Sequence, residues 1–454
     1  MKKYIILLFI VVFLVSMVFT GVSCKEEAAE EVAEEEVAEE EVAEEEEVAE
    51  EVEEEVAEEV VLSGSIHFLA YPWFALSDET LAKFTETTGV EITQEVLGYN
   101  ELNTKFTTSS AAGTLPADVF STYVAPLAAH VAAGFVEPLD GYISDELRED
   151  ILGIDVFQFN GQQMGVPTYY DITCMMYNKE LLEAAGIDSV PETLDELVEV
   201  CLDIKEAGVC EYPLVIPLAA HVGMGDRWYN IALAYGNEPL FDENYQPQFT
   251  DKDSGGYKAL EFMKNANGTI VDPALVDATD LNVNDIFLAG DGVFIFGSPG
   301  LVTRAEDPEV SKIVGEKVGL ALFPGSDKTR SATLNFYLDG LSVSSLSENK
   351  DAAWAFIEWW NTAEIAEAAY NDLGVLPTRK SLLSTFIEQG LVPGDTFIYD
   401  QSEYGMPIFQ SGIPTWFDEW AMDAAGQLNK AIRGDISIDE ALEIMTSKAL
   451  ELQE

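Results

Sequence analysis

Two groups of aromatic and hydroxyl-bearing side chains directly follow apolar segments in the first third of the chain. Tyr71 and Trp73 come after SIHFLA, while Thr122 and Tyr123 close the segment ADVFSTY. Flat rings can stack on the apolar faces of a small molecule, and hydroxyl and indole N–H groups can hydrogen-bond its polar edges. The chemistry that these residues offer is reversible binding.

Residues for other kinds of chemistry do not occur in the patterns that such chemistry needs. The sequence has no Ser/His/Asp elbow and no phosphate-binding loop. Its three histidines, at positions 67, 130 and 221, are scattered and give no metal-ligand spacing. We therefore expect no catalytic residue, no bound metal and no cofactor.

Alternating strands and helices are expected to position the two aromatic groups. Ser77 is a suitable N-cap for the first helix, and Gly89 a suitable end. The order of elements implies right-handed crossovers and a parallel sheet. Ligands of such sheets bind outside the carboxyl ends of the strands, where both groups lie. The expected elements are strand 65–71, helix 77–89, strand 91–97, a helix through Leu102 and Phe106, and strand 117–123.

The alternation continues toward the C-terminus. Thr193 and Glu196 form the pattern of a capping box before apolar helical positions. The apolar spacing of Ala353, Phe356, Ile357 and Trp360 indicates a helix packed on a core. Further expected elements are a strand running toward Tyr177, a helix ending at Gly186, strands in 292–298, 318–325 and 335–345, and helical structure from Pro414 to Leu442.

The N-terminus has the pattern of an export signal. Lys2 and Lys3 precede an apolar stretch that ends at Thr20. This stretch is shorter than a typical transmembrane helix. The arrangement resembles a bacterial lipoprotein signal, in which the cut falls before a cysteine that carries the lipid. That cysteine is Cys24, although Gly21 stands where this signal usually has Leu. An ordinary signal peptide or an uncleaved anchor is the alternative.

A solid acidic repeat follows Cys24. Residues 25–60 hold 21 Glu and one Lys, a net charge of −20, and their valines sustain no heptad. Self-repulsion favours an extended, solvated linker. Removing this charge and the +2 of the signal from the total of −60 leaves −42 on residues 61–454. Because a globular part with this negative charge repels other polyanions, nucleic acid and anionic lipid are disfavoured as partners.

The chain length and the cysteine positions constrain the number of lobes and the possible disulfides. The globular 394 residues exceed one core of ordinary size, so two lobes are expected. Cys201 and Cys210 lie across the end of an expected helix and could pair in an oxidising compartment. Cys174 stands in an apolar strand and is expected to be a buried thiol.

Seven collinear stretches across residues 61–454 carry a family resemblance. They are FTETTGVEIT, LPADVFSTYVAPLAAHVAAGFVEPLD, GVPTYYDITCMMYNKELLEAAGI, VPETLDELVEV, IFLAGDGVFIFGSPG, KDAAWAFIEWW and LGVLPTRKSL. Their order resembles the extracellular solute-binding proteins of ABC transporters, in the family 1 group that includes maltose- and oligosaccharide-binding proteins. The resemblance implies a periplasmic-binding-protein-like (type II) fold with two α/β lobes, hinge crossings and an inter-lobe cleft.

The resemblance also implies a division of the chain. The signal is expected at 1–23, and the lipidated cysteine with its linker at 24–60. One lobe takes 61–170 and about 340–378, and the other takes about 171–339 and 379–454. The protein is then expected to be a monomer, tethered to the outer face of the cell membrane through Cys24, whose closed form a permease recognises.

A sugar site needs aromatic rings with polar groups at their edges. Asp171 matches the position at which maltose-type relatives place a ligand-binding carboxylate, and YLDG is expected to be a second crossing. Gly300 stands where relatives often carry a stacking Trp. Beside the four residues of the first two loops, the expected ligand-binding residues are Tyr169, Tyr170, Asp171, Asp226, Arg227, Trp228, Ser298, Tyr337, Asp339, Trp416 and Trp420.

Most of these residues have an ordinary structural alternative. Asp226 is also a suitable N-cap, and the Trp pair at 416 and 420 has the spacing of a core-facing helix. A receptor for a polyamine or for ferric iron, held by the adjacent tyrosines 169 and 170, is an alternative function. A glycoside hydrolase with Asp171 and Asp339 as its paired carboxylates is another, but the sequence sets no distance between them.

Overall fold

The computed structural model describes residues 62–454, except 171, 328–332, 335–337 and 393–396. The expected signal, the acidic repeat, Cys24, Asp171 and Tyr337 therefore lie outside the described residues. Within the described part, no helix is both long and apolar enough to cross a membrane.

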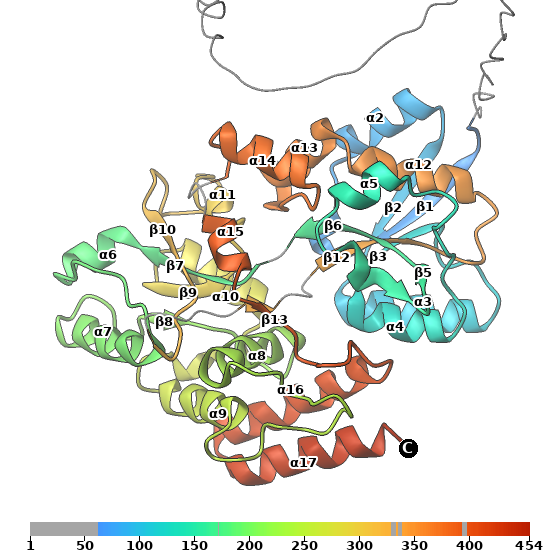
Figure 1. Cartoon of the computed structure of the whole chain (residues 1–454). Helices are drawn as coiled ribbons and strands as arrows, with labels where there is room; N and C mark the ends of the chain where they lie inside the picture. The colour runs from blue at the N-terminus through green and yellow to red at the C-terminus, as the bar shows by residue number, and fades with distance from the viewer. Residues whose placement is uncertain (1–61, 171, 328–332, 335–337, 393–396) are drawn as a thin grey trace, which may run out of the picture. The chain divides into compact units, whose positions relative to one another are not determined.

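The first sheet has the strand order β2-β1-β3-β12-β6 (Figure 1). Its strands are β1 (Ser65–Ala70), β2 (Glu91–Val96), β3 (Val119–Tyr123), β6 (Val166–Tyr170) and β12 (Leu338–Val343). β1 pairs with both β2 and β3 in parallel, which confirms the parallel sheet predicted for residues 65–123. β12 is antiparallel to both β3 and β6, and it brings a segment from much later in the chain between them.

Helices cover both faces of this sheet. The helices around it are α2 (Asp78–Thr88), α3 (Tyr99–Ala111), α4 (Val124–Ala132), α5 (Asp145–Asp150), α12 (Lys350–Trp360) and α13 (Ala363–Leu373). In Figure 1, α2 and α12 lie on one side of the strands and α3 and α4 on the other. Short elements complete this part: η1 (Pro72–Phe74), η2 (Ile154–Phe157), β4 (Gln158–Phe159) and β5 (Gln162–Gln163).

Local sequence signals set the ends and faces of these helices as expected. The Ser77 side chain accepts a hydrogen bond from the Thr80 N–H at the start of α2, and Gly89 ends the helix with φ +75°. The four apolar positions predicted to face a core from α12 are all buried, among them Phe356 beside Phe68 of β1 at 5.0 Å between ring centroids.

The second sheet has the order β10-β7-β9-β8. Its strands are β7 (Cys174–Asn178), β8 (Leu214–Val215), β9 (Phe294–Gly297) and β10 (Val318–Ala321). The helices of this lobe are α6 (Lys179–Ala184), α7 (Leu194–Glu206), α8 (Val222–Gly236), α9 (Gly255–Ala266), η3 (Pro273–Asp277), α10 (Asp280–Leu288), α11 (Leu301–Ala305), α16 (Phe417–Arg433) and α17 (Ile438–Glu451).

Each sheet carries its own hydrophobic core, so the fold has two lobes, as predicted. Apart from Val124 and Ala125, the buried residues of the second core come from 174–323 and 408–449, and those of the first from 66–166 and 338–375. A small third cluster joins α13 to α14 (Lys380–Glu388) and α15 (Phe397–Ser402). A short sheet pairs β11 (Thr333–Leu334) with β13 (Gly405–Met406).

The structure adds detail to several local expectations. The stretch from Pro414 to Leu442 is two helices, because Gly434 ends α16 with φ +85°. α8 starts at Val222 after His221, so Asp226 lies in its second turn and is not its N-cap. Cys201 and Cys210 are both free thiols. Cys174 is a fully buried thiol, as predicted, and it is not in a disulfide with another described cysteine.

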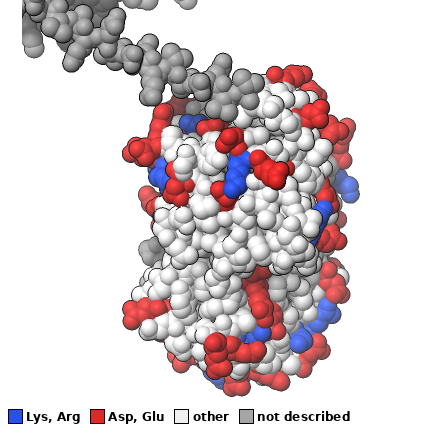
Figure 2. Space-filling view, turned by 90° about the vertical axis from the view of Figure 1, so that its right-hand side faces the viewer, with Lys and Arg blue, Asp and Glu red and all other residues white. Residues whose placement is uncertain are grey.

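The charge of the surface agrees with the composition. Asp and Glu are scattered over the face shown in Figure 2, with fewer Lys and Arg among them.

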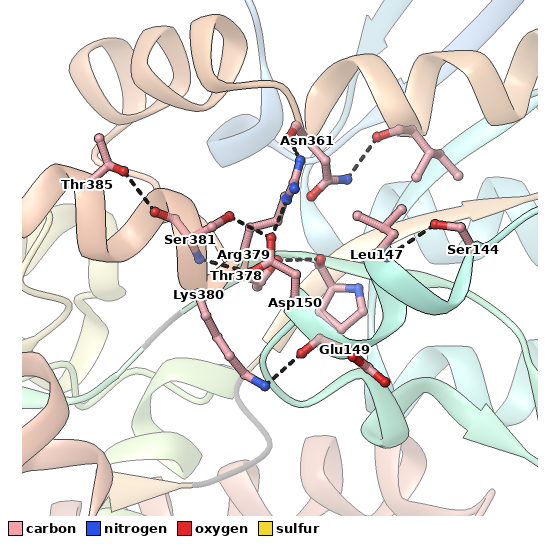
Figure 3. A network of polar contacts seen from close by, with 12 residues as sticks. Ser144, Leu147, Glu149, Asp150, Asn361, Thr378, Arg379, Lys380, Ser381 and Thr385 are labelled. Atoms are coloured by element: carbon pink, nitrogen blue, oxygen red, sulfur yellow. Dashed lines mark hydrogen bonds and ion pairs between the residues drawn. The ribbon is translucent and has the colours of Figure 1, made fainter.

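A polar network fastens the start of α14 to α5 (Figure 3). Asp150 accepts hydrogen bonds from Arg379 Nε at 2.7 Å, from the Ser381 N–H at 2.9 Å and from the Ser381 hydroxyl at 2.6 Å. Lys380 donates to the Glu149 carbonyl at 2.8 Å. Asp150 thus acts as the missing N-cap of α14, since Arg379 provides no side-chain cap of its own.

Replacing Asp150 by alanine is expected to lower the free energy of unfolding by about 1–3 kcal/mol at neutral pH. Burial acts to raise the pKa of Asp150, but the hydrogen bonds from Ser381 and Arg379 outweigh it and lower the pKa. The stabilisation is therefore present above the ordinary pKa of Asp and is lost as the pH falls through the lowered value.

Urea unfolding at about pH 7 and about pH 3 measures this difference. Replacing the exposed Asp155 by alanine is the control, with no large effect at either pH. An Asp150 variant that loses the same free energy at both pH values would contradict the assignment.

Candidate ligand-binding pocket

A cavity of about 360 Å³ is lined by residues from both lobes. The first lobe contributes Trp73, Tyr99, Tyr123, Tyr169 and Asp339. The second lobe contributes charged and polar groups, among them Asp226, Arg227, Asp280, Ser298 and Arg304. The cavity therefore has one largely aromatic wall and one largely polar wall.

A row of four rings runs along the aromatic side, and all of them except the buried Tyr71 line the pocket. Trp73 stacks on Tyr71 at 4.8 Å between ring centroids, Tyr71 lies 5.6 Å from Tyr99, and Tyr99 lies 5.4 Å from Tyr123. The rings come from the loops that follow β1 and β2 and from the end of β3. The carboxyl ends of parallel strands meet at one edge of a sheet, and for this reason three separate segments build one wall.

Asp339 places a carboxylate in the middle of this wall. In the sheet register it lies opposite Tyr123 of β3 on one side and Tyr169 of β6 on the other. Its Oδ2 accepts a hydrogen bond from the Trp73 indole N–H at 2.8 Å. The bond holds the indole ring at the pocket, where its face is available for stacking.

The polar wall is built around Arg227 on α8. Its Nη2 donates to Asp280 Oδ1 of α10 at 3.1 Å, and the two side chains are 12% and 31% exposed. Its Nε is buried and has no hydrogen-bond partner among the described residues. The charge of Arg227 is already balanced by Asp280. Its remaining N–H groups can therefore donate hydrogen bonds to an uncharged oxygen of a ligand.

A chain of hydroxyl groups leads from the pocket to the second lobe. The Tyr99 hydroxyl contacts a carboxylate oxygen of Asp418 on α16 and lies 3.1 Å from the Tyr123 hydroxyl. Burial raises the pKa of Asp418, while the hydrogen bond from Tyr99 counteracts this. Burial, with the nearby charges of Asp418 and Asp226, raises the pKa of Tyr123, so this phenol keeps its proton.

The two lobes also touch through glycine backbones at the edge of the pocket. Gly300 precedes α11 in the second lobe, and Gly374 ends α13 in the first. A Cβ on Gly300 would lie 1.9 Å from the Gly374 carbonyl oxygen. Gly300 has φ −58°, so its requirement for glycine comes from this close approach and not from its own backbone conformation.

Seven of the residues proposed from the sequence line the pocket. They are Trp73, Tyr123, Tyr169, Asp226, Arg227, Ser298 and Asp339. They come from both lobes, and Tyr169 donates to the Ser298 hydroxyl across the boundary at 3.3 Å. Asp171 and Tyr337, also proposed, lie outside the described residues.

The remaining proposed residues lie away from the pocket lining. Trp228 and Trp420 are in the second core, where their indole N–H groups donate to the carbonyls of Gly256 at 2.9 Å and Met445 at 2.8 Å. Trp416 packs on the same core. Tyr71 and Thr122 are fully buried in the first lobe, and Tyr170 packs beside the first core and the third cluster.

Other pocket residues were not among those proposed from the sequence. Tyr99 directly follows the second strand, so the rule that selected Tyr71 and Tyr123 could have found it as well. Asp280 and Arg304 had no such signal. They lie on α10 and α11, and only the packing of these helices brings them to the same pocket as Arg227.

Comparisons with known proteins agree with this architecture. The profile of the family described as bacterial extracellular solute-binding protein matches residues 79–389. The maltotriose-binding protein of Pyrococcus abyssi is 26% identical over 288 residues, which cover 61% of this chain and 58% of that protein. The mannitol-binding protein of Pseudomonas aeruginosa is 27% identical over 274 residues, which cover 58% of this chain and 60% of that protein.

Among solved structures, a maltose-bound binding protein of T. maritima is similar with a TM-score of 0.76 at 22% identity. The match covers 86% of this chain and 100% of the other. At this identity the likeness supports the two-lobe fold.

Proposed function

The chain belongs to the family of bacterial extracellular solute-binding proteins, and on this basis we propose that it is the receptor of an ABC importer for a sugar. It captures the sugar between its lobes, and the closed form delivers it to the membrane permease. A solute that contacts both walls favours closure because its contacts are more numerous in the closed arrangement.

The pocket chemistry is the observation that carries this proposal. A sugar has apolar C–H faces and a rim of hydroxyls, which match a ring wall with a carboxylate at its centre and an arginine opposite. The two relatives named for maltotriose and mannitol support the same class of ligand.

The size of the cavity favours a small member of this class. A volume of about 360 Å³ corresponds to about a dozen water molecules at about 30 Å³ each. It suits a monosaccharide, an alditol or a disaccharide better than a long oligosaccharide. One observation disfavours ferric iron as the solute: Tyr170 does not line the pocket beside Tyr169.

Thermal-shift and calorimetric titration of residues 61–454 with monosaccharides, alditols and disaccharides tests the proposal. We expect at least one of them to bind tightly and to raise the melting temperature. Binding of only ferric iron or a polyamine would overturn the sugar assignment, and release of sugar from a chromogenic glycoside would overturn the receptor assignment.

The lipid anchor on Cys24 is part of the same proposal. Its support is the apolar segment before Cys24, together with the extracellular placement of the family. Replacing Cys24 by alanine is then expected to move the protein from the membrane fraction to the soluble fraction, because one substitution removes the lipid attachment. Unchanged membrane association of the variant would rule this anchor out.

A further inference from the structure

The described residues that line the pocket hold three carboxylates and two guanidinium groups. The carboxylates belong to Asp226, Asp280 and Asp339, and the guanidinium groups to Arg227 and Arg304. Both arginines and two of the carboxylates are on the second-lobe wall, whereas Asp339 is among the rings of the first lobe. The charge that a ligand meets therefore differs between the two walls.

The positive charges of the second-lobe wall lie beside negative charges of α10. Arg227 Nη2 is 3.1 Å from Asp280 Oδ1, and Arg304 Nη2 is 3.9 Å from Asp285 Oδ1. His221 on the same wall accepts a backbone N–H through Nδ1 at 3.4 Å, so its ring adds no positive charge in this arrangement. A negatively charged ligand group would have to compete with the α10 carboxylates for these arginines.

The first-lobe wall presents a negative charge among aromatic rings. Asp339 lies opposite Tyr123 and Tyr169 in the sheet register. Its carboxylate accepts the Trp73 indole N–H at 2.8 Å, which is one of the about four hydrogen bonds that a carboxylate can accept. The described lining residues of this lobe include no Lys or Arg. This wall therefore attracts positive charge.

Two more carboxylates act on the same rings. Asp418 contacts the Tyr99 hydroxyl from α16. Burial raises the pKa of Tyr123, and the negative charges of Asp418 and Asp226 raise it further. The face of an aromatic ring is itself electronegative, so the rings and the carboxylates act on a ligand in the same direction.

We propose that the solute is an amino sugar, whose protonated amine lies against Asp339 and the rings around it. The inference rests on the proposed function and adds the charge of the sugar to it. An ammonium group donates three hydrogen bonds and is attracted both by a carboxylate and by the face of an aromatic ring. The same charges disfavour a sugar acid.

The polar wall suits the uncharged part of such a ligand. Asn284 has an amide that can both donate and accept, and Ser298 has a hydroxyl. Arg227, whose charge is balanced by Asp280, can donate to a ring hydroxyl. A sugar with one amine can therefore use both walls, while a linear polyamine has no hydroxyls for the polar one.

Calorimetric titration with matched sugars tests the proposal. The probes are glucose, glucosamine, N-acetylglucosamine and glucuronate, with the corresponding galactose and mannose series. The titrations are done at about pH 6, where aliphatic amines are protonated and carboxyl groups ionised. We expect the amino sugar of at least one series to bind tightest of all, about 10-fold or more tighter than its parent hexose, and the sugar acids to bind weakest.

Replacing Asp339 by asparagine locates the amine. The amide keeps the shape of the side chain and an oxygen for the Trp73 N–H, but it removes the negative charge. Affinity for the amino sugar should fall by about 10-fold or more and affinity for the parent hexose by no more than about 3-fold. Asp155→Asn removes the same charge from an exposed position outside the pocket lining and should leave the preference unchanged.

The melting temperatures of both variants without ligand show that they are folded. A neutral sugar or a sugar acid as the tightest ligand, or a preference for the amine that persists in Asp339→Asn, would overturn the inference and leave the sugar receptor in place. Failure of every sugar to bind, or binding of spermidine alone, would overturn the proposed function together with the inference.

Discussion

Replacing Gly300 by alanine is expected to hold the two lobes apart and to weaken sugar binding by about 10- to 100-fold. The added methyl group would meet the carbonyl oxygen of Gly374 at 1.9 Å, and a backbone atom cannot rotate away as a side-chain tip can. Relieving an overlap of this kind costs about 1–3 kcal/mol, and the cost falls on the arrangement in which the lobes touch.

Small-angle scattering and calorimetry on the same samples measure both consequences. The radius of gyration with saturating sugar should be larger for Gly300→Ala than for the native protein, while the melting temperature without sugar should change little. Gly141→Ala is the matched control, because a Cβ there has nothing within 4 Å. A Gly300 variant with native affinity and native dimensions would show that closure does not need this contact.

Replacing Trp73 by alanine is expected to reduce sugar affinity by about 30-fold or more. The change removes the ring at the end of the aromatic wall and leaves Asp339 without the indole N–H that it accepts at 2.8 Å. Loss of one stacking face and one oriented polar group together is worth about 2–3 kcal/mol. Trp73→Phe retains a ring and should fall between the alanine variant and the native protein.

Trp416→Ala is a suitable control for this series. Trp416 is also a partly buried tryptophan, but it packs against Phe241, Tyr245 and Phe409 of the second core. Its removal should lower the melting temperature and leave the affinity of the folded protein unchanged. If Trp416→Ala weakened binding as much as Trp73→Ala, the assignment of the aromatic wall as the ligand site would be wrong.

Much of the first sheet could be predicted because its signals are local. Ser77 and Gly89 mark the ends of α2 through contacts within four residues, and the apolar spacing of α12 identifies its buried face. The rule for parallel sheets then places the loops after β1 and β3 at one edge, and Trp73 and Tyr123 do line the pocket.

The tryptophans of the second lobe show where such reasoning stops. Trp228 and Trp420 have polar neighbours in sequence, as a binding residue would, yet both lie in the core. Each indole N–H finds a carbonyl partner inside the protein, at Gly256 and Met445. Which face of α8 or α16 becomes the inside depends on the helices packed against it, and no local pattern records that choice.

The sequence by itself determined the two α/β bodies and the loops that could meet a ligand, because these follow from periodicity, composition and helix caps a few residues long. Only the tertiary structure decided which side chains share the pocket. Tyr99 and Asp418 are 319 residues apart, and Gly300 meets Gly374 across two lobes. Such pairs are set by the packing of whole lobes, whose free energy is spread over many contacts and leaves no signature at any single position.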